Sequence, residues 1–320
     1  MMPDTVVIAP PLCSRAEWRR QRAAREATPV ASTVIGLRPR RSRLHRLKDP
    51  GIPWVLKSLG LQGRALANAR DLRLRVMELG FPTLPAAFDG YTLLHLSDPH
   101  VGMVEGVLER AVALVGAHPV DLVILTGDVQ TNGWPAAPAA ARRLEPLLAA
   151  IRSRDGIVAV LGNHDHHTLP DALERLGVRV LINGHAMIVR GSERIHLAGT
   201  DDVNCFFTED AVRLLEAAPA GFVVALVHSP ELADVAARTG HALYLSGHTH
   251  GGQIVLPGGR ALFTATRRLG WLAAGLWRLG AMQGYTSTGI GTGLVRARFN
   301  CPPEMALIRL RCRPPGGPGR

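Results

Sequence analysis

The feature that most constrains the fold is a series of six apolar runs, five of which end in residue types that bind metals. The runs are "YTLLHL", "VDLVIL", "GIVAVL", "RIHLAG", "FVVALV" and "ALYLS", and "LRLRVMEL" at 72–79 alternates apolar and polar residues as a half-buried strand does. Helix-like segments lie between the runs at 105–116, 136–153, 170–176 and 208–217. Strands that alternate with helices indicate an α/β fold.

The polar residues that follow these runs predict a metal site. In α/β sheets, ligands bind in the crevice at the carboxyl ends of the strands, and side chains just past the last apolar position face it. Carboxylate, amide and imidazole donors together suit Mn, Fe or Zn. They are too many for one ion that keeps a position open, and their number fits two ions that share a carboxylate. The polar residues at these strand ends are Asp98, His100, Asp128, Asn163, His164, Asp165, His228, His248 and His250.

The stretch "SGHTHGGQ" at 246–253 places two of these histidines between glycines, directly after an apolar run. Gly247, Gly251 and Gly252 permit a tight turn and a close approach of the backbone to a bound group. Two loop histidines with ordinary hydrogen bonds are the alternative reading of this stretch taken alone.

The order of the polar blocks resembles a known signature. The chain reads "DPH" at 98–100, "GD" at 127–128, "GNHD" at 162–165, histidine at 228 and "GHTH" at 247–250. This order is similar to that of the calcineurin-like metallophosphoesterases, and the resemblance covers about 71–313. It implies a four-layer α/β/β/α sandwich.

The resemblance also implies roles for these residues. Two ions that share Asp128 would lower the pKa of a common water, so that hydroxide attacks phosphorus near neutral pH. His164 would contact the phosphoryl oxygen or protonate the leaving group. The implied ligands are Asp98, His100, Asp128 and His250 for one ion, and Asp128, Asn163, His228 and His248 for the other.

One block departs from this signature. Some members of the family place a carboxylate shortly after the Gly-Asp pair, where it contacts the histidine that corresponds to His164. Here the sequence is "GDVQTNG", without an acid. Asp165 is then a candidate to orient His164, and the alternative is that it caps the following turn.

The substrate is indicated by a finer resemblance. "SGHTHGGQ" together with "FNCPPE" at 299–304 is similar to a bacterial branch that contains membrane-associated phosphodiesterases and UDP-2,3-diacylglucosamine pyrophosphohydrolases of lipid A synthesis. We therefore expect a lipid-linked or nucleotide-sugar diphosphate, with soluble nucleotides as the alternative. Asp202 and Arg298 are candidate substrate contacts, and turn formation and a surface ion pair are their alternative roles. His166 and His167 are candidates for the rim of the site.

Charge divides the chain. Residues 1–80 hold 16 Lys and Arg against 6 Asp and Glu, whereas the other 240 residues hold 21 against 20. The sequence predicts a basic, partly disordered extension at 1–70 with a short helix around 15–26, a catalytic domain at 71–313 and a disordered tail at 314–320. The extension could contact an anionic membrane. Nucleic acid is a less favoured partner, because aromatic interleaving is missing.

Two further features bear on location. The chain begins without a basic stretch followed by an apolar core, and its four cysteines lack CxxC spacing, so we expect a cytoplasmic protein. The segment 262–285 is basic and contains two tryptophans. It could lie in a membrane interface, cover an acyl-bearing substrate, or pack on the domain as a helix. A peripheral enzyme on the inner face of the membrane is consistent with these features.

Overall fold

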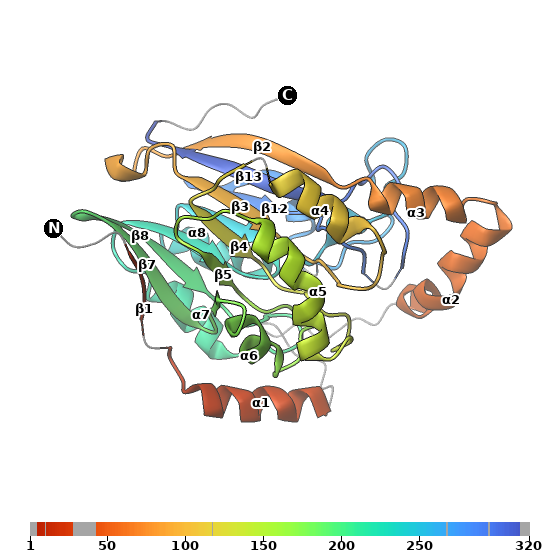
Figure 1. Cartoon of the computed structure of the whole chain (residues 1–320), viewed down its shortest axis with the longest axis horizontal. Coiled ribbons are helices and arrows are strands. Elements are labelled where there is room, and N and C mark those ends of the chain that lie inside the picture. The colour runs from red at the N-terminus through yellow and green to blue at the C-terminus, as the bar shows by residue number, and fades with distance from the viewer. Residues whose placement is uncertain are drawn as a thin grey trace.

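A computed structural model describes residues 5–9, 11–27, 43–116, 118–266, 268–293 and 295–313. Over these residues the chain forms two β-sheets with helices on their outer faces (Figure 1).

The first sheet contains three of the strands that precede candidate ligands. Its order is β2-β13-β3-β4-β5-β6. The strands are β2 (Arg73–Gly80), β3 (Thr92–Leu96), β4 (Leu122–Leu125), β5 (Ile157–Ala159), β6 (Val178–Val180) and β13 (Glu304–Arg311). Strands β3 to β6 are parallel, so each connection crosses over through a helix. These helices are α4 (Val107–Val115), α5 (Ala137–Ala150) and α6 (Leu169–Glu174).

The second sheet contains the strands that precede the remaining candidates. Its order is β1-β7-β8-β9-β10-β12-β11. The strands are β1 (Thr5–Ile8), β7 (Gly184–Arg190), β8 (Glu193–Gly199), β9 (Phe222–Leu226), β10 (Leu243–Ser246), β11 (Gly275–Leu279) and β12 (Met282–Thr286). Helices α7 (Glu209–Glu216) and α8 (Ala233–Arg238) pack on its outer face.

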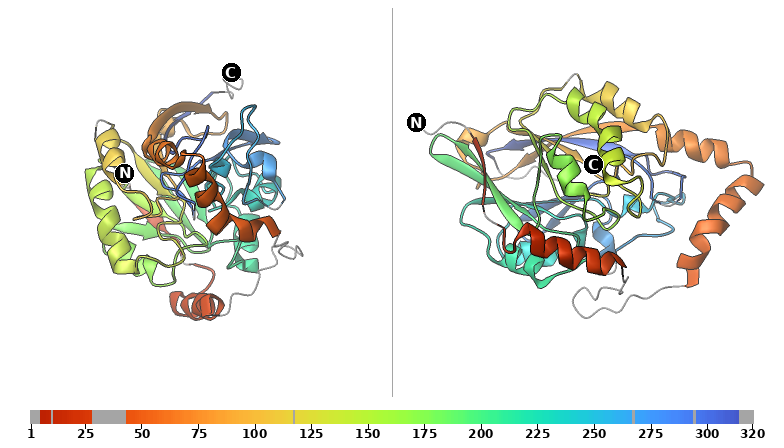
Figure 2. Two further views of the ribbon diagram at one scale, coloured as in Figure 1. Left: turned by 90° about the vertical axis from the view of Figure 1, so that its right-hand side faces the viewer. Right: turned by 60° about the horizontal axis from the view of Figure 1, so that its bottom comes forward.

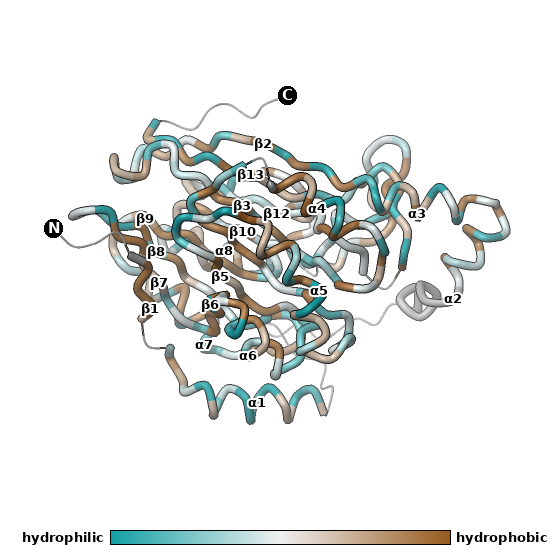
Figure 3. Tube along the Cα trace, in the orientation of Figure 1, coloured by the Kyte–Doolittle hydropathy of each residue, from teal (hydrophilic) through white to brown (hydrophobic). Residues whose placement is uncertain are grey.

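Three apolar cores hold four layers together, which is the α/β/β/α sandwich that the sequence resemblance implied. In β4, Leu122 and Ile124 face the second sheet, while Val123 and Leu125 face the helices α4, α5 and α6. A strand buried on both faces is apolar at every position, and this explains the uninterrupted runs in the sequence. The strands accordingly form the hydrophobic centre of the molecule (Figure 3).

The predicted strands and helices of the catalytic region are confirmed, with one correction. The segment 262–285, for which a helix was considered, forms a short 3₁₀ turn (Gly270–Leu272) and the β11–β12 hairpin at the sheet edge. Trp277 is buried and donates from Nε1 to Thr286 Oγ1 at 2.9 Å, whereas Trp271 is 62% exposed. Within the described ranges, no helix has the length and apolarity that crossing a bilayer requires.

The N-terminal segment is part of the sandwich. Strand β1 pairs with β7 in the second sheet, and α1 (Arg15–Ala27) packs on the domain through Trp18 and Arg22 (Figures 1 and 2). The structure therefore does not show a separate unit ending at residue 70. The sequence could not indicate this packing, because the contacts that hold the segment join residues far apart in the chain. Trp18 Nε1 donates to Asp201 at 2.7 Å, and Arg22 also donates to Asp201.

Helices α2 (Arg43–Ser58) and α3 (Gln62–Arg70) stand out from the two-sheet body at the right of Figure 1. The expected tail at 314–320, and residues 28–42 of the expected extension, lie outside the described residues.

Candidate metal centre

Loops from both sheets converge on one site at the carboxyl ends of their strands. Three of them follow β3, β4 and β5 of the first sheet, and two follow β9 and β10 of the second. In strand order, these loops contribute Asp98 with His100, Asp128, Asn163, His228, and His248 with His250. The rule that ligands bind at strand ends describes the carboxyl edge of a single sheet. The site lies instead where the two sheets meet, because the sandwich brings both sets of strand ends together.

Asp98, His100 and His250 form the first group, and all three are buried. His100 Nε2 lies 3.2 Å from His250 Nε2, and His250 Nε2 lies 3.5 Å from Asp98 Oδ1. The backbone N–H of His248 donates to both Asp98 carboxylate oxygens, at 3.1 and 3.0 Å, which fixes this carboxylate against the "GHTH" loop.

Asp128, His228 and His248 form the second group, with Asn163 beside them. His228 Nε2 lies 3.2 Å from Asp128 Oδ2, 3.2 Å from Asn163 Oδ1 and 3.3 Å from His248 Nδ1. Asp128 Oδ2 also lies 3.6 Å from His100 Nε2 in the first group. Asp128 therefore lies between the groups, as a bridging carboxylate must.

The hydrogen bonds on the outer side of the imidazoles fit a metal site. His100 Nδ1 donates to the Gln130 carbonyl at 2.9 Å, and His228 Nδ1 donates to the Thr126 carbonyl at 2.6 Å. These bonds direct each Nε2 atom into the site, where it faces other metal-ligand atoms. Such outer hydrogen bonds orient metal-binding histidines in proteins. Converging lone pairs repel one another unless a cation or a proton lies between them, so the donor set fits divalent ions.

The backbone of the site is strained. Asp98, His100, Asp128, His248 and His250 all have positive φ, between 41° and 69°. A left-handed conformation costs an L-residue roughly 1–2 kcal/mol. Such strain accumulates at functional sites, where it aims side chains that a relaxed loop would direct elsewhere.

Glycines let the loops approach one another. A Cβ at Gly162 would lie 2.1 Å from Asp128 Oδ1, and a Cβ at Gly247 would lie 2.1 Å from Asp98 Oδ2. Gly251 and Gly252 have φ of 58° and 82°, so they serve the expected tight turn. Gly247 has a different role, because glycine is needed there to leave room for the Asp98 carboxylate.

Asn132 contacts the candidate catalytic His164, and the sequence reasoning did not name it. Its Oδ1 accepts from His164 Nδ1 at 2.7 Å. It belongs to the "GDVQTNG" block, in which some family members have a carboxylate after the Gly-Asp pair. The amide of Asn132 in that block is the feature from which its contact with His164 could have been predicted. Asp165 does not orient His164. It accepts from the backbone N–H groups of Asp128, Gln130 and Gly162 at 2.8, 3.0 and 2.8 Å, and so ties two of the loops together.

The two proposed substrate contacts have structural roles in the fold. Asp202 is 1% exposed and accepts from the backbone N–H groups at 204, 205 and 206. Arg298 is fully buried and donates to the carbonyls of Thr288, Gly289 and Gly291 at 2.6, 3.1 and 2.6 Å, and to that of Cys301 at 3.2 Å. Turn formation and loop bracing account for these residues. Their burial does not support contact with substrate.

Metal binding is expected to release a proton from His228. Burial opposes the charge on this ring, but the Asp128 carboxylate prevails and raises the pKa of His228 to about 10 in the metal-free protein. At pH 7 the ring is therefore cationic, and an ion must displace its Nε2 proton. Burial lowers the pKa of His100 to about 3 and that of His248 to about 4, so these rings are already neutral.

We accordingly expect at least about one proton released per chain at pH 7, and an affinity that rises by at least about tenfold per pH unit from 7 to 8.5. Calorimetry in buffers of different ionisation enthalpy measures both quantities. Binding without proton release and without pH dependence would contradict the expectation.

A protein-family model and several known proteins match this chain. The calcineurin-like phosphoesterase family model matches residues 91–252, a range that includes all seven candidate ligands. Metallophosphoesterase YkuE of Bacillus subtilis is 27% identical over 71% of this chain and 82% of its own length. Phosphodiesterase YaeI of Escherichia coli is 27% identical over 69% of this chain and 82% of its own length. A transmembrane protein with metallophosphoesterase domain from Danio rerio is 32% identical over 56% of this chain and 44% of its own length.

Proposed function

The chain belongs to the calcineurin-like phosphoesterase family and is a hydrolase, and on that premise we propose that it cleaves a lipid-linked or nucleotide-sugar diphosphate with the help of two divalent ions. The observation that carries the proposal is the pair of ligand groups that share Asp128. A carboxylate shared by two groups of oxygen and nitrogen ligand atoms suits two ions, and this mixture of donors suits Mn, Fe or Zn.

Each residue has a role in this proposal. Asp98, His100, Asp128 and His250 would hold one ion, and Asp128, Asn163, His228 and His248 the other. When bound, such ions activate water and offset negative charge on a phosphoryl group. The neutral amide of Asn163 supplies an oxygen without adding negative charge, so the site stays attractive to phosphate.

His164 would exchange a proton with the substrate, and Asn132 would position it. The ring of His164 stacks edge-on against His100 with centroids 5.2 Å apart, so it borders the first ligand group. Asn132 occupies its Nδ1 at 2.7 Å, which leaves Nε2 for the phosphoryl oxygen or the leaving group. General acid catalysis by a positioned imidazole typically contributes about 10²–10⁴-fold.

Two substitutions at Asn132 test whether its side chain orients the His164 ring by accepting a hydrogen bond. Asn132→Asp keeps an oxygen acceptor and adds a negative charge beside His164, so the basic limb of the pH–rate profile should move upward while kcat is largely retained. Asn132→Gly keeps the left-handed backbone and removes the acceptor, so kcat should fall about tenfold with the profile unmoved. Steady-state kinetics from pH 5 to 10 checks both. Identical profiles for the three proteins would contradict the positioning role.

A pocket beside the ligand groups supports a substrate with an apolar part. It has a volume of about 560 Å³ and is lined by Gly251, which follows His250, and by Val255, Ala274 and Trp271. Arg75 also lines it. Its lining combines apolar side chains with polar groups, as a site for a small amphiphilic ligand requires. UDP-2,3-diacylglucosamine, with two acyl chains beside a diphosphate, is one such substrate.

Trp271 provides the test of this substrate class. Trp271→Ala is expected to raise KM for UDP-2,3-diacylglucosamine about tenfold, a loss of ~1.4 kcal/mol of apolar contact, and to leave hydrolysis of bis(p-nitrophenyl) phosphate unchanged. Val76→Ala, at an exposed apolar site on β2, is the matched control. Equal effects on both substrates, or hydrolysis of soluble nucleotides without turnover of the glycolipid, would favour a phosphodiesterase for soluble nucleotides.

The arginines of α1 give little support to a nucleic-acid-binding function. Arg19 contacts Asp171 at 2.7 Å, Arg22 pairs with Asp201, and Arg15 pairs with Glu174. These charges are directed to the domain's own acids. A peripheral membrane location remains part of the proposal, because Trp54 and Leu59, at the C-terminal end of α2 and just beyond it, are 69% and 65% exposed. Stimulation of activity by anionic vesicles tests that location, and activity unaffected by vesicles would argue against it.

A further inference from the structure

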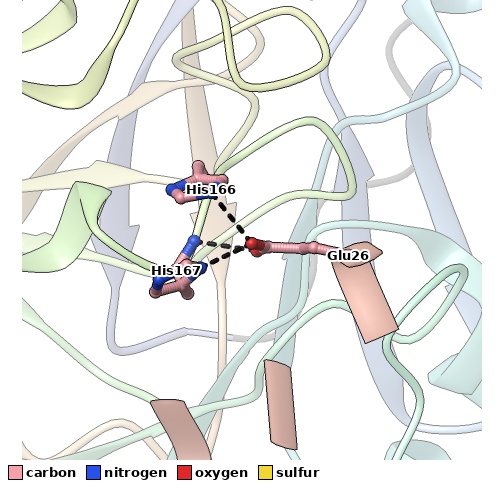
Figure 4. A group of neighbouring side chains, drawn as sticks. All are labelled: Glu26, His166 and His167. Atoms are coloured by element: carbon pink, nitrogen blue, oxygen red, sulfur yellow. Dashed lines mark hydrogen bonds and ion pairs between the residues drawn. The ribbon is translucent and has the colours of Figure 1, made fainter. Parts of the chain in front are cut away.

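A third cluster of metal-ligand side chains lies outside the metal centre. It joins Glu26, in the last turn of α1, to His166 and His167, which follow the "GNHD" block (Figure 4). Glu26 Oε2 lies 3.1 Å from His166 Nε2 and 2.6 Å from His167 Nδ1. The three ligand atoms lie within 4.8 Å of one another.

The side chains are partly buried but can be reached from solvent. The exposed fractions are 15% for Glu26, 21% for His167 and 40% for His166. The centroids of the two imidazole rings lie 4.0 Å apart, and each ring directs a nitrogen to Glu26 Oε2. In Figure 4 the histidines approach Glu26 from one side, which leaves the carboxylate as the common point of the cluster.

We propose that Glu26, His166 and His167 bind a single zinc ion that fastens helix α1 to the loop carrying His164. Two imidazoles and one carboxylate, with water in a fourth position, form a known zinc ligand set. Ligand atoms about 2.0–2.1 Å from a tetrahedral ion lie roughly 3.3 Å apart. The distance from His166 Nε2 to Glu26 Oε2 already fits this geometry. The distance from His167 Nδ1 to Glu26 Oε2 must widen by less than about 1 Å.

The surroundings can accept the ion. His166 Nδ1 lies 2.8 Å from Thr168 Oγ1, so when Nε2 binds the ion, the ring proton moves to Nδ1 and is donated to this hydroxyl. Burial lowers the pKa of His166, which keeps the ring neutral at pH 7. Arg22 Nε lies 3.4 Å from Glu26 Oε1, but its charge is already matched by Asp201. Glu26 then supplies the carboxylate that offsets the charge of the ion.

The site is connected to the catalytic loops. The backbone N–H of His166 donates to Gln130 Oε1 at 2.9 Å, and the N–H of Gly133 donates to the His164 carbonyl at 2.8 Å. Arg22 of α1 also donates to the carbonyls of Gly162 and Asp165. An ion held between α1 and positions 166 and 167 would therefore stiffen the loop that positions His164. Zinc availability would regulate the order of this loop separately from the occupancy of the metal centre.

The test counts zinc in protein whose metal centre has been disabled. In the full chain carrying Asp128→Asn and His250→Ala, we expect about one equivalent of bound Zn²⁺ by equilibrium dialysis and elemental analysis. We also expect Co²⁺ to give the intense visible bands of a tetrahedral site. Adding Glu26→Gln should abolish both signals, while its amide still accepts a hydrogen bond from His167. Adding His118→Ala instead, at an exposed histidine outside the cluster, should change neither.

A second measurement separates loss of zinc from loss of folding. Zn²⁺ should slow trypsin cleavage within α1 severalfold in the protein that retains Glu26 and have no effect in the Glu26→Gln variant, with matching circular dichroism spectra. If the Glu26→Gln variant bound as much zinc as its parent, the imidazoles would only be hydrogen-bonded to Glu26 and the proposal would be overturned. Because the metal centre is disabled in every arm, the result is independent of the proposed phosphoesterase reaction.

Discussion

Asp128→Asn should reduce kcat/KM by about 10³-fold or more, which is the largest effect expected of any single substitution in this chain. The carboxylate approaches both ligand sets, at 3.6 Å from His100 Nε2 and 3.2 Å from His228 Nε2. Its other oxygen accepts from the backbone N–H of His164 at 2.8 Å, so it also fixes the catalytic loop. Removing one preorganised charge from such a site costs roughly 3–4 kcal/mol, or more where two ions depend on it.

The same variant should lose bound metal together with activity. An amide oxygen cannot bridge two cations as a carboxylate does, so elemental analysis should show fewer ions per chain. Asp210→Asn is the matched control, because Asp210 lies in α7 and pairs with Arg213. Retention of both metal content and activity in a folded Asp128→Asn protein would show that this residue does not bridge the ions.

Gly247→Ala should reduce kcat/KM by about 10²-fold and weaken metal binding. The added Cβ would lie 1.8 Å from Ser97 Oγ and 2.1 Å from Asp98 Oδ2. Neither contact is tolerable, so Asp98 or the "GHTH" loop must move by about 1 Å, and displacements of that size cost roughly 10²-fold in rate. Overpacking should also lower the free energy of unfolding by about 1–3 kcal/mol.

Gly63→Ala provides the contrasting change. Gly63 lies in α3 with nothing within 4 Å of an added Cβ, so alanine there should leave activity intact and stabilise the protein by up to about 1 kcal/mol. Kinetics, metal titration and thermal unfolding on both variants check the pair. If Gly247→Ala kept full activity, the close approach of these loops would be unnecessary for the site.

The sequence determined which residues could form the centre. Carboxylates, an amide and imidazoles directly follow apolar runs, and strands buried on both faces leave such residues no place but the strand ends. The predicted strands at β3, β4, β5, β9 and β10, the helices α4 to α7, and the α1 helix were all found. Position gave the polar residues at the strand ends, and the order of the blocks gave the family resemblance that implied which of them are ligands.

Only the tertiary structure decided how these residues meet. The centre combines strand ends of two sheets, and the pairing of β1 with β7 brings the N-terminal segment into the second of them. Position in the sequence also could not show that Arg298 and Asp202 are buried braces, or that Asn132 supports His164. The physical reason is that a side chain's role depends on burial and on partners far along the chain. Glu26 and His167, 141 positions apart, make contact only because α1 packs on the folded domain.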